Sequence, residues 1–424
     1  MMIRRTLALR AGAMLAGALM TAIASAPAAA QENSRPLAQA LKKVSFVTSA
    51  RDTAAPADAQ APAAAENPVL KFFSGTELMG FVDTYYAYNF NTPKTPCATV
   101  GGVAVSNCLH NFDVTHNTFS LNLAEVALEK KPTTDSRGGF RVDLDYGPAA
   151  AMVAAFDPSG LEVSQHIQQA YVSYLAPAGK GTVQLDFGKF VTQHGAEVIE
   201  TKDNWNYSRS LLFALAIPYY HMGVRLAYNP NDKMSFGANI SNGWNNTVEN
   251  NQGKTAGFMG IFKPTAAFTW TVNYMVGPEQ PEGTPGMRNL FDTTLAYTAS
   301  PKLALMLNVD MGKDNAVDSI SGEKGATWHG LGAYLKYTPN SWFALVPRYE
   351  HLQDKDKFMT GVAQNVQEFT LTFEFKHKDG VMMRVEYRGD YSDTPFFIKN
   401  AGESTKNQNA IILGWVYAFS SKTP

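Results

Sequence analysis

A short alternating pattern recurs along most of the chain and constrains the fold more than any other feature. Between residues 381 and 391, apolar and charged residues fall on different parities. One parity has Met383, Val385, Tyr387 and Tyr391, and the other has Met382 followed by the charged residues Arg384, Glu386, Arg388 and Asp390. Successive side chains of a strand point to opposite faces, so this segment predicts a strand with one apolar and one charged face. Charge on one face of nearly every such segment argues against a soluble all-β protein with a dry core and favours a water-filled interior.

Sixteen segments share this alternation and are predicted to be strands. They lie near residues 76–90, 117–130, 139–147, 166–176, 181–191, 219–229, 233–243, 255–263, 266–276, 288–299, 302–312, 326–338, 341–351, 365–377, 380–391 and 407–420. In the second segment the apolar parity changes after Leu123, and a β-bulge near Ala124 would account for that change.

The connections between these segments alternate between short and long. The short ones, such as "NPND", "TPNS" and "HKDG", contain the Pro, Gly, Asn and Asp that tight turns use. The long ones lie near residues 91–116, 148–165, 192–218, 244–254, 277–287, 313–325, 352–364 and 392–406. This interleaving predicts an all-β fold: a transmembrane antiparallel β-barrel of about 16 strands with short periplasmic turns and long extracellular loops. The last segment ends in aromatic residues, which is typical of chains delivered to the barrel assembly machinery.

The N-terminus indicates export from the bacterial cytoplasm. Arginines at positions 4, 5 and 10 precede an apolar stretch and the small-residue run Ala28-Ala29-Ala30, so residues 1–30 predict a Sec signal peptide cleaved near Ala30. The apolar stretch is short for the alternative, a membrane anchor. Residues 31–70 are rich in Ala and Pro and predict a disordered periplasmic linker, or alternatively a short helical bundle or cell-wall contact. Residues 71–424 would then form the barrel, placed in the outer membrane in contact with its lipid and lipopolysaccharide.

A barrel of this size leaves an aqueous lumen, which side chains on the polar parity would line. The predicted pore-lining residues are Arg141, Asp143, Asp145, Arg225, Lys336, Arg348, Glu350, Glu368, Glu374, Arg384, Glu386 and Arg388. Acidic and basic residues are mixed among them, and no ladder of one sign is present. The set therefore predicts polar or weakly cation-preferring traffic, although each charge alone is better explained as a solvated or paired wall residue.

The third long connection, residues 192–218, predicts a constriction loop. Its tail from Ser208 to Pro218 contains apolar residues that would be disfavoured in water, and folding into the barrel would hide them against the wall. The charged residues brought to the constriction would be Glu197, Glu200, Lys202, Asp203 and Arg209. The alternative is an outward lid that covers the mouth of the barrel.

Other chemistry has weaker support in the sequence. Cys97 and Cys108 are the only cysteines and are predicted to pair in the first outer loop, with a metal site or a reactive thiol as the alternative. The eight histidines show no ligand spacing, and no nucleophile motif such as G-x-S-x-G is present, so we expect neither a metal, nor another cofactor, nor an enzyme. With 36 basic and 37 acidic residues and no basic stripe, nucleic acid is not an expected partner.

Several blocks resemble a known family. The strand "FVDTYYAYNFNTP", the segments "FSLNLAEVALEKKP" and "GFRVDLDYGP", and above all the block "NYSRSLLFALAIPYYHMG" are similar to the beta-barrel porin 2 family of OmpL-like porins, over about residues 76–420. The resemblance implies an outer-membrane porin for passive diffusion of small hydrophilic solutes and ions. Two other functions stay open: a channel specific for a sugar or an organic acid, and an adhesin or envelope-interaction barrel. Trimers are common among barrels of this size, so a homotrimer is an assembly that the sequence allows.

Overall fold

The computed structural model describes residues 75–155, 157, 165–179, 181–317 and 324–422. The predicted signal peptide (1–30) and linker (31–70) lie outside the described residues. Within the described part of the chain, no helix combines the length and apolarity needed to cross a membrane.

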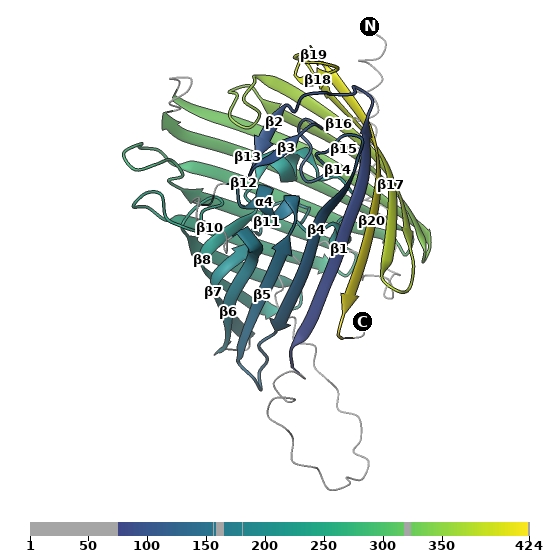
Figure 1. The fold of residues 1–424 in the computed structure, drawn as a ribbon. Helices are drawn as coiled ribbons and strands as arrows, with labels where there is room; N and C mark the ends of the chain where they lie inside the picture. The colour runs from purple at the N-terminus through teal and green to yellow at the C-terminus, as the bar shows by residue number, and fades with distance from the viewer. Residues whose placement is uncertain (1–74, 156, 158–164, 180, 318–323, 423–424) are drawn as a thin grey trace.

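The predicted sixteen-stranded barrel is confirmed (Figure 1). Each strand pairs antiparallel with its neighbours in sequence, and the last strand closes the barrel on the first from Met79–Ser420 to Asn89–Ala410. The wall strands are β1 (Glu77–Asn89), β4 (Thr118–Lys130), β5 (Gly138–Tyr146), β6 (Ile167–Ala178), β7 (Gly181–Val191), β8 (Tyr220–Asn231), β9 (Met234–Ser241), β10 (Thr255–Thr265), β11 (Phe268–Gly277), β12 (Arg288–Ser300), β13 (Leu303–Val317), β14 (Lys324–Asn340), β15 (Phe343–Asp354), β16 (Gln364–Lys376), β17 (Val381–Ser392) and β20 (Asn407–Ser420).

Alternation along each strand separates two surfaces of the wall. On β17, Tyr387 is exposed, whereas Arg384, Glu386 and Arg388 are at most 1% exposed. Large apolar side chains such as Val172, Phe187 and Trp415 are exposed on other strands. The outward face is therefore apolar, as lipid requires, and the inward face carries the charges.

One predicted connection needs correction, and one predicted bulge can be located. The connection between β13 and β14 spans residues 318–323 rather than 313–325, because β13 and β14 continue their pairing to Val317 and Lys324. The added residues, 313–317 (KDNAV) and 324–325 (KG), show no alternation of apolar and polar residues that could mark them as strand. The predicted bulge is confirmed and lies two residues before Ala124: Asp83 pairs with Leu123 and Thr84 with Leu121, which leaves Asn122 as the extra residue.

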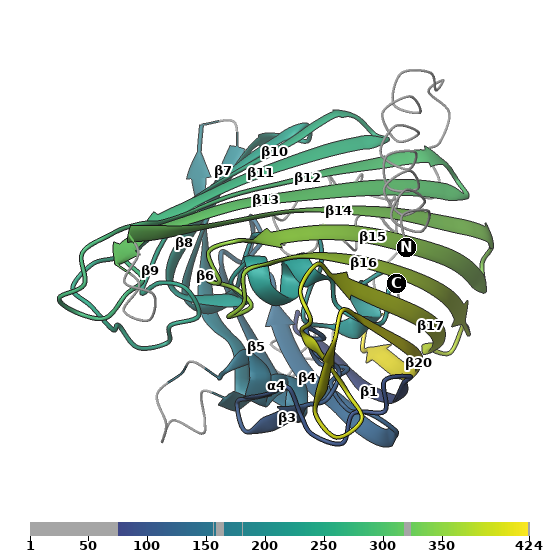
Figure 2. The ribbon, with the colours of Figure 1, turned by 90° about the horizontal axis from the view of Figure 1, so that it is seen from above.

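The loops at the mouth of the barrel contain small elements of their own (Figure 2). The hairpin of β2 (Ala98–Val100) and β3 (Val103–Val105) contacts the helix α4 (Pro148–Val153) through β3. A second hairpin consists of β18 (Phe397–Lys399) and β19 (Glu403–Thr405). Buried apolar residues from several loops pack with inward-facing wall residues in one cluster, which includes Phe112, Ala149, Phe213, Trp328 and Phe397. Part of the interior is thus a packed apolar core.

Candidate functional site: the lumen and its third loop

The third loop (192–218) packs against the inner side of the barrel wall. A 3-10 helix covers Thr201–Asp203 and a π-helix covers Leu212–Ala216. Leu211, Leu212 and Phe213 are at most 2% exposed, and the indole Nε1 of Trp328 on β14 donates to the carbonyl of Ala216 at 3.1 Å. The apolar tail is thereby removed from water, which stabilises the inward position of the loop.

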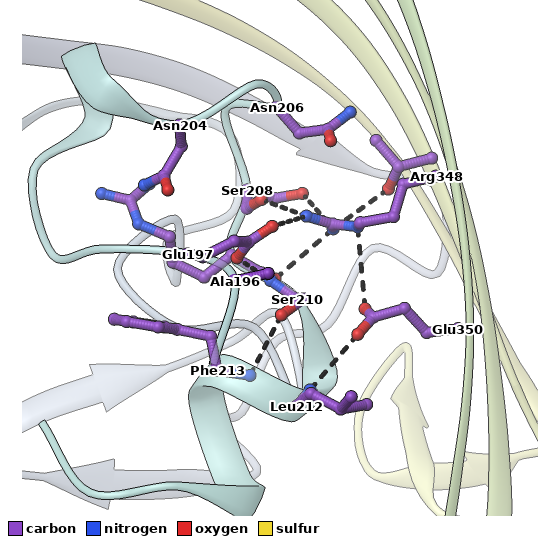
Figure 3. A network of polar contacts seen from close by, with 12 residues as sticks. Ala196, Glu197, Asn204, Asn206, Ser208, Ser210, Leu212, Phe213, Arg348 and Glu350 are labelled. Atoms are coloured by element: carbon purple, nitrogen blue, oxygen red, sulfur yellow. Dashed lines mark hydrogen bonds and ion pairs between the residues drawn. The ribbon is translucent and has the colours of Figure 1, made fainter. Parts of the chain in front are cut away.

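Arg348 on β15 joins the loop to the wall (Figure 3). Its Nη1 donates to Glu197 Oε1 at 2.8 Å and to the carbonyl of Ser208 at 2.7 Å, both in the loop. Its Nε lies 3.0 Å from Glu368 Oε2 and 3.6 Å from Glu350 Oε2, both on the wall. The guanidinium is fully buried, so these partners replace all of its hydration.

The wall also satisfies the buried backbone of the loop, which would otherwise lose its hydrogen bonds to water. Glu386 accepts from the amides of Tyr207 at 2.7 Å and Ser208 at 2.9 Å, and Glu350 accepts from that of Leu211 at 2.7 Å. Arg384, paired with Glu374 at 2.7 Å, donates to loop carbonyls, namely those of Thr201, Asn204 and Asn206. The charges on β15, β16 and β17 therefore form a docking surface for the loop.

Asp83 on β1 fixes a further part of the loop. Its carboxylate accepts from the hydroxyls of Tyr207 at 2.8 Å and Thr201 at 2.5 Å, and from the amide of Asn122 at 2.6 Å. Gly414 on β20 makes room for the Tyr207 ring, because a Cβ at this position would lie 2.1 Å from Tyr207 Cδ2. The loop is thus held from β15 round to β1.

A cavity remains between the loop and the part of the wall formed by β1 and β4 to β8, and both signs of charge line it. The loop contributes Val198, Glu200, Lys202 and Asp203, and the wall contributes Arg141 of β5 and Arg225 of β8 among others. Its acidic residues are Glu77, Glu129, Glu200 and Asp203, and its basic residues are Lys131, Arg141, Lys202 and Arg225. Ion pairs restrain part of this set, with Arg225 Nη2 2.7 Å from Asp186 and Arg141 Nε 2.9 Å from Asp143.

The predicted site residues separate into two groups. Arg141, Arg225, Glu200, Lys202 and Asp203 line the cavity. Most of the others serve in the docking contacts described above: Glu197, Arg348, Glu350, Glu368, Glu374, Arg384 and Glu386, with Lys336 2.9 Å from Glu374. Arg388 donates to the carbonyl of Arg209 at 2.7 Å, and Arg209 in turn donates to loop carbonyls. Asp143 and Asp145 lie on β5 and are fully buried.

Sequence reasoning missed some residues that hold the loop. Asn206 donates to the carbonyl of Val346 and to the hydroxyl of Thr372, and Tyr207 bonds to Asp83. The density of Asn, Trp, Tyr and Ser in "DNWNYSRS" is the signal that could have suggested a buried, hydrogen-bonded segment.

The first outer loop is also fastened inside the barrel. Cys97 and Cys108 form a disulfide with a Cα–Cα distance of 5.9 Å, and Gln408 on β20 bonds to both the amide and the carbonyl of Cys108. His110 bridges two carboxylates: its Nδ1 lies 2.5 Å from Asp113 and its Nε2 lies 3.0 Å from Asp390 on β17. This residue connects the first loop to the wall.

Charges around His110 favour its protonated form. Burial lowers the pKa of His110 and Arg388 acts in the same direction, but the carboxylates of Asp113 and Asp390 outweigh both, so the pKa is raised. Burial also opposes ionisation of Asp113, yet the contact with His110 prevails and lowers the pKa of this carboxyl. A protonated imidazole can donate to both carboxylates, whereas a neutral one can donate to only one.

We therefore expect the docking of the first loop to weaken as the pH rises above about 6.5. The pKa of His110 is higher in the folded protein than its unfolded value of about 6.5. Its contribution to the stability of the docked loop is therefore complete below the unfolded pKa and is lost as the pH rises through the folded pKa. Proteolysis within residues 97–114 should accelerate over that range in the wild type. In His110→Gln the rate, corrected for protease activity, should not depend on pH there. An equal pH dependence in both proteins would contradict the assignment.

A closed barrel with an apolar exterior and a charged, loop-narrowed interior defines an outer-membrane channel of the porin class. The chain belongs to the family described as "Putative beta-barrel porin-2, OmpL-like", which matches residues 75–419 and confirms the predicted resemblance. The protein is therefore an outer-membrane porin, and its family and fold indicate a channel. Among curated proteins, none matches the chain significantly.

Solved structures of other outer-membrane proteins share the fold. The anion-selective porin from Comamonas acidovorans is 11% identical, with a TM-score of 0.52 over 81% of this chain and 99% of its own. The outer membrane channel DcaP of Acinetobacter baumannii is 15% identical, with a TM-score of 0.52 over 82% and 98%. The trimer form of OmpT of Vibrio cholerae is 10% identical, with a TM-score of 0.51 over 81% and 99%. At these identities the likeness shows the fold alone.

Proposed function

We propose that this porin conducts small hydrophilic solutes and ions passively, through the cavity between the third loop and the β5–β8 side of the wall. The observation that supports this most is that the interior charges fall into two sets with different surroundings. Those on β15–β17 are occupied by the loop, whereas Arg141, Arg225, Glu200 and Asp203 line the cavity. Acids on the loop and arginines on the wall would then act on a solute together, which selects for size and charge distribution.

The rest of the chain fits an exported envelope protein. We propose that residues 1–30 are a Sec signal peptide cleaved near Ala30, that residues 31–70 are a periplasmic linker, and that residues 71–424 form the barrel with 192–218 as its constriction loop. Lipopolysaccharide would contact the apolar exterior, and the barrel assembly machinery would insert the chain. A homotrimer is the proposed assembly, supported by the trimer form of the similar OmpT.

Charge substitutions in the cavity test this function. Glu200→Gln combined with Asp203→Asn should shift the reversal potential in a salt gradient toward anions, and Arg141→Gln combined with Arg225→Gln should shift it toward cations. A unit charge about 4 Å from an ion in bulk-like water contributes about 1 kcal/mol, so the permeability ratio should change by roughly fivefold or more. Glu249→Gln, in an outer loop and paired with Lys254, is the control. Unchanged reversal potentials in both double variants would refute the proposed passage.

A further inference from the structure

Four carboxylates meet at the flank of the third loop that faces β4 and β5. Glu125 of β4 pairs directly with Asp145 of β5, and Asp143 lies two residues earlier on the same face of β5. Glu200 approaches from the loop. One carboxylate oxygen from each of Glu125, Asp143 and Glu200 lies within 4.8 Å of the others, and all four residues are at most 8% exposed. Like charges directly opposite each other on neighbouring strands are destabilising, and burial increases that cost.

Some of these oxygens find no hydrogen-bond donor among the residues that the structure describes. They are Glu125 Oε2 and both carboxylate oxygens of Asp145, all of which are buried. Asp143, in contrast, accepts from Arg141 and from Gln169. A buried carboxylate that lacks a donor requires some other positive partner.

The neighbouring protein cations are already engaged with other acids. Arg141 bonds to Asp143 and lies 3.8 Å from Glu129. Lys202 lies 2.5 Å from Asp203, and Lys189 lies 3.7 Å from Asp157. The nearby cations in the described part of the chain therefore do not neutralise all the negative charge of the four carboxylates.

The arrangement suits a hard cation. Oxygens that share one calcium ion at about 2.3–2.6 Å can lie up to roughly twice that distance apart, which accommodates the observed separations. An all-carboxylate ligand set without Cys or His favours calcium or magnesium over transition metals, and ligands drawn from two strands and a loop suit the flexible coordination of calcium better than an octahedral magnesium shell. Glu200 also lines the cavity, so an ion could reach the cluster from the lumen.

We propose that Glu125, Asp143, Asp145 and Glu200 form a calcium-binding site that ties the third loop to β4 and β5. The site would add a tie to β4 and β5 to those that Arg348 and Arg384 make on β15 and β17. Bound calcium would offset the repulsion between Glu125 and Asp145 and hold Glu200 against the wall. This inference stands on the carboxylate geometry and does not require the channel to be open.

The test is a calorimetric titration of the full chain with CaCl2. The protein is refolded in detergent without lipopolysaccharide, whose phosphates bind divalent cations themselves, and is washed with EDTA. The wild type should bind one ion per chain. Glu125→Gln with Asp145→Asn should weaken binding by at least about tenfold, since these side chains would be direct ligands. Asp186→Asn, a buried interior carboxylate paired with Arg225, should bind as the wild type does.

A second measurement on the same proteins does not rely on calorimetry. Calcium should slow tryptic cleavage at Lys202 in the wild type and in Asp186→Asn, but not in the double variant. Folding of each variant is checked by its heat-dependent migration in gels, and Glu125→Gln alone serves if the double variant does not fold. No saturable binding by the wild type would overturn the proposal, and so would undiminished binding by the variants. If the wild type does not bind calcium, some carboxylates of the cluster are protonated instead, and infrared bands of protonated carboxyl groups would show this.

Discussion

Replacing Arg348 with Met should release the third loop from the wall and enlarge the channel. The substitution leaves Glu197, Glu350 and Glu368 without their shared cation and the carbonyl of Ser208 without a donor. Removing one partner of a buried ion pair costs about 3–5 kcal/mol. We expect single-channel conductance to rise and to fluctuate as the loop moves. Arg348→Lys should keep the loop docked only in part, because an ammonium lacks the planar guanidinium geometry that reaches several acceptors at once.

Conductance and proteolysis of the same preparation check this expectation. The released loop should become cleavable at Lys202 and Arg209, both within 192–218. Arg288→Met is the matched control, since Arg288 is an interior arginine on β12 that lies 3.0 Å from Asp314 rather than against the loop. A wild-type conductance and cleavage pattern in Arg348→Met would show that the arginine does not hold the loop.

Gly414→Val should have a comparable effect although it changes no charge. The Tyr207 ring lies where the new Cβ would be, 2.1 Å from Cδ2 and 2.3 Å from Cε2. The ring must move, and its hydrogen bond to Asp83 is lost with it. Overpacking costs about 1–3 kcal/mol, and a hydrogen bond to a charged group contributes about 1.5–3 kcal/mol. We therefore expect both lower thermal stability and a more mobile loop.

A double-mutant cycle separates this steric effect from a general weakening of β20. In a Tyr207→Ala background the ring is absent, so Gly414→Val should cost much less than it does in the wild type. Each variant is heated in steps before electrophoresis, and the measured quantity is the temperature at which the fast-migrating band of the folded barrel disappears. Additive effects of the two substitutions would mean that Gly414 and Tyr207 act independently, contrary to the packing described.

The wall was predictable because successive side chains of a strand alternate between its apolar outer face and its polar inner face. Arg384, Glu386 and Arg388 were placed inward by parity, and the structure puts their side chains there. Parity failed where apolar and polar residues do not alternate in the sequence, as at the ends of β13 and β14.

The contacts inside the barrel were not predictable in the same way. Parity says that Arg348 points inward, but it does not say that Glu197, far away in sequence, comes to meet it. Similarly, the carboxylates of Glu125 and Glu200 meet only because the loop folds against β4 and β5. Loop segments have no periodicity, and their positions follow from buried polar groups finding partners across the lumen.

The most direct test of the central claim is the single-channel conductance of the refolded wild-type protein in planar bilayers, with reversal potentials recorded in a salt gradient. The account predicts steady, ohmic openings of a narrow pore whose selectivity responds to the charges at Glu200, Asp203, Arg141 and Arg225. An absence of conductance from protein that migrates as a folded barrel would contradict it, because the interior would then be closed and the function would have to reside in the outer loops.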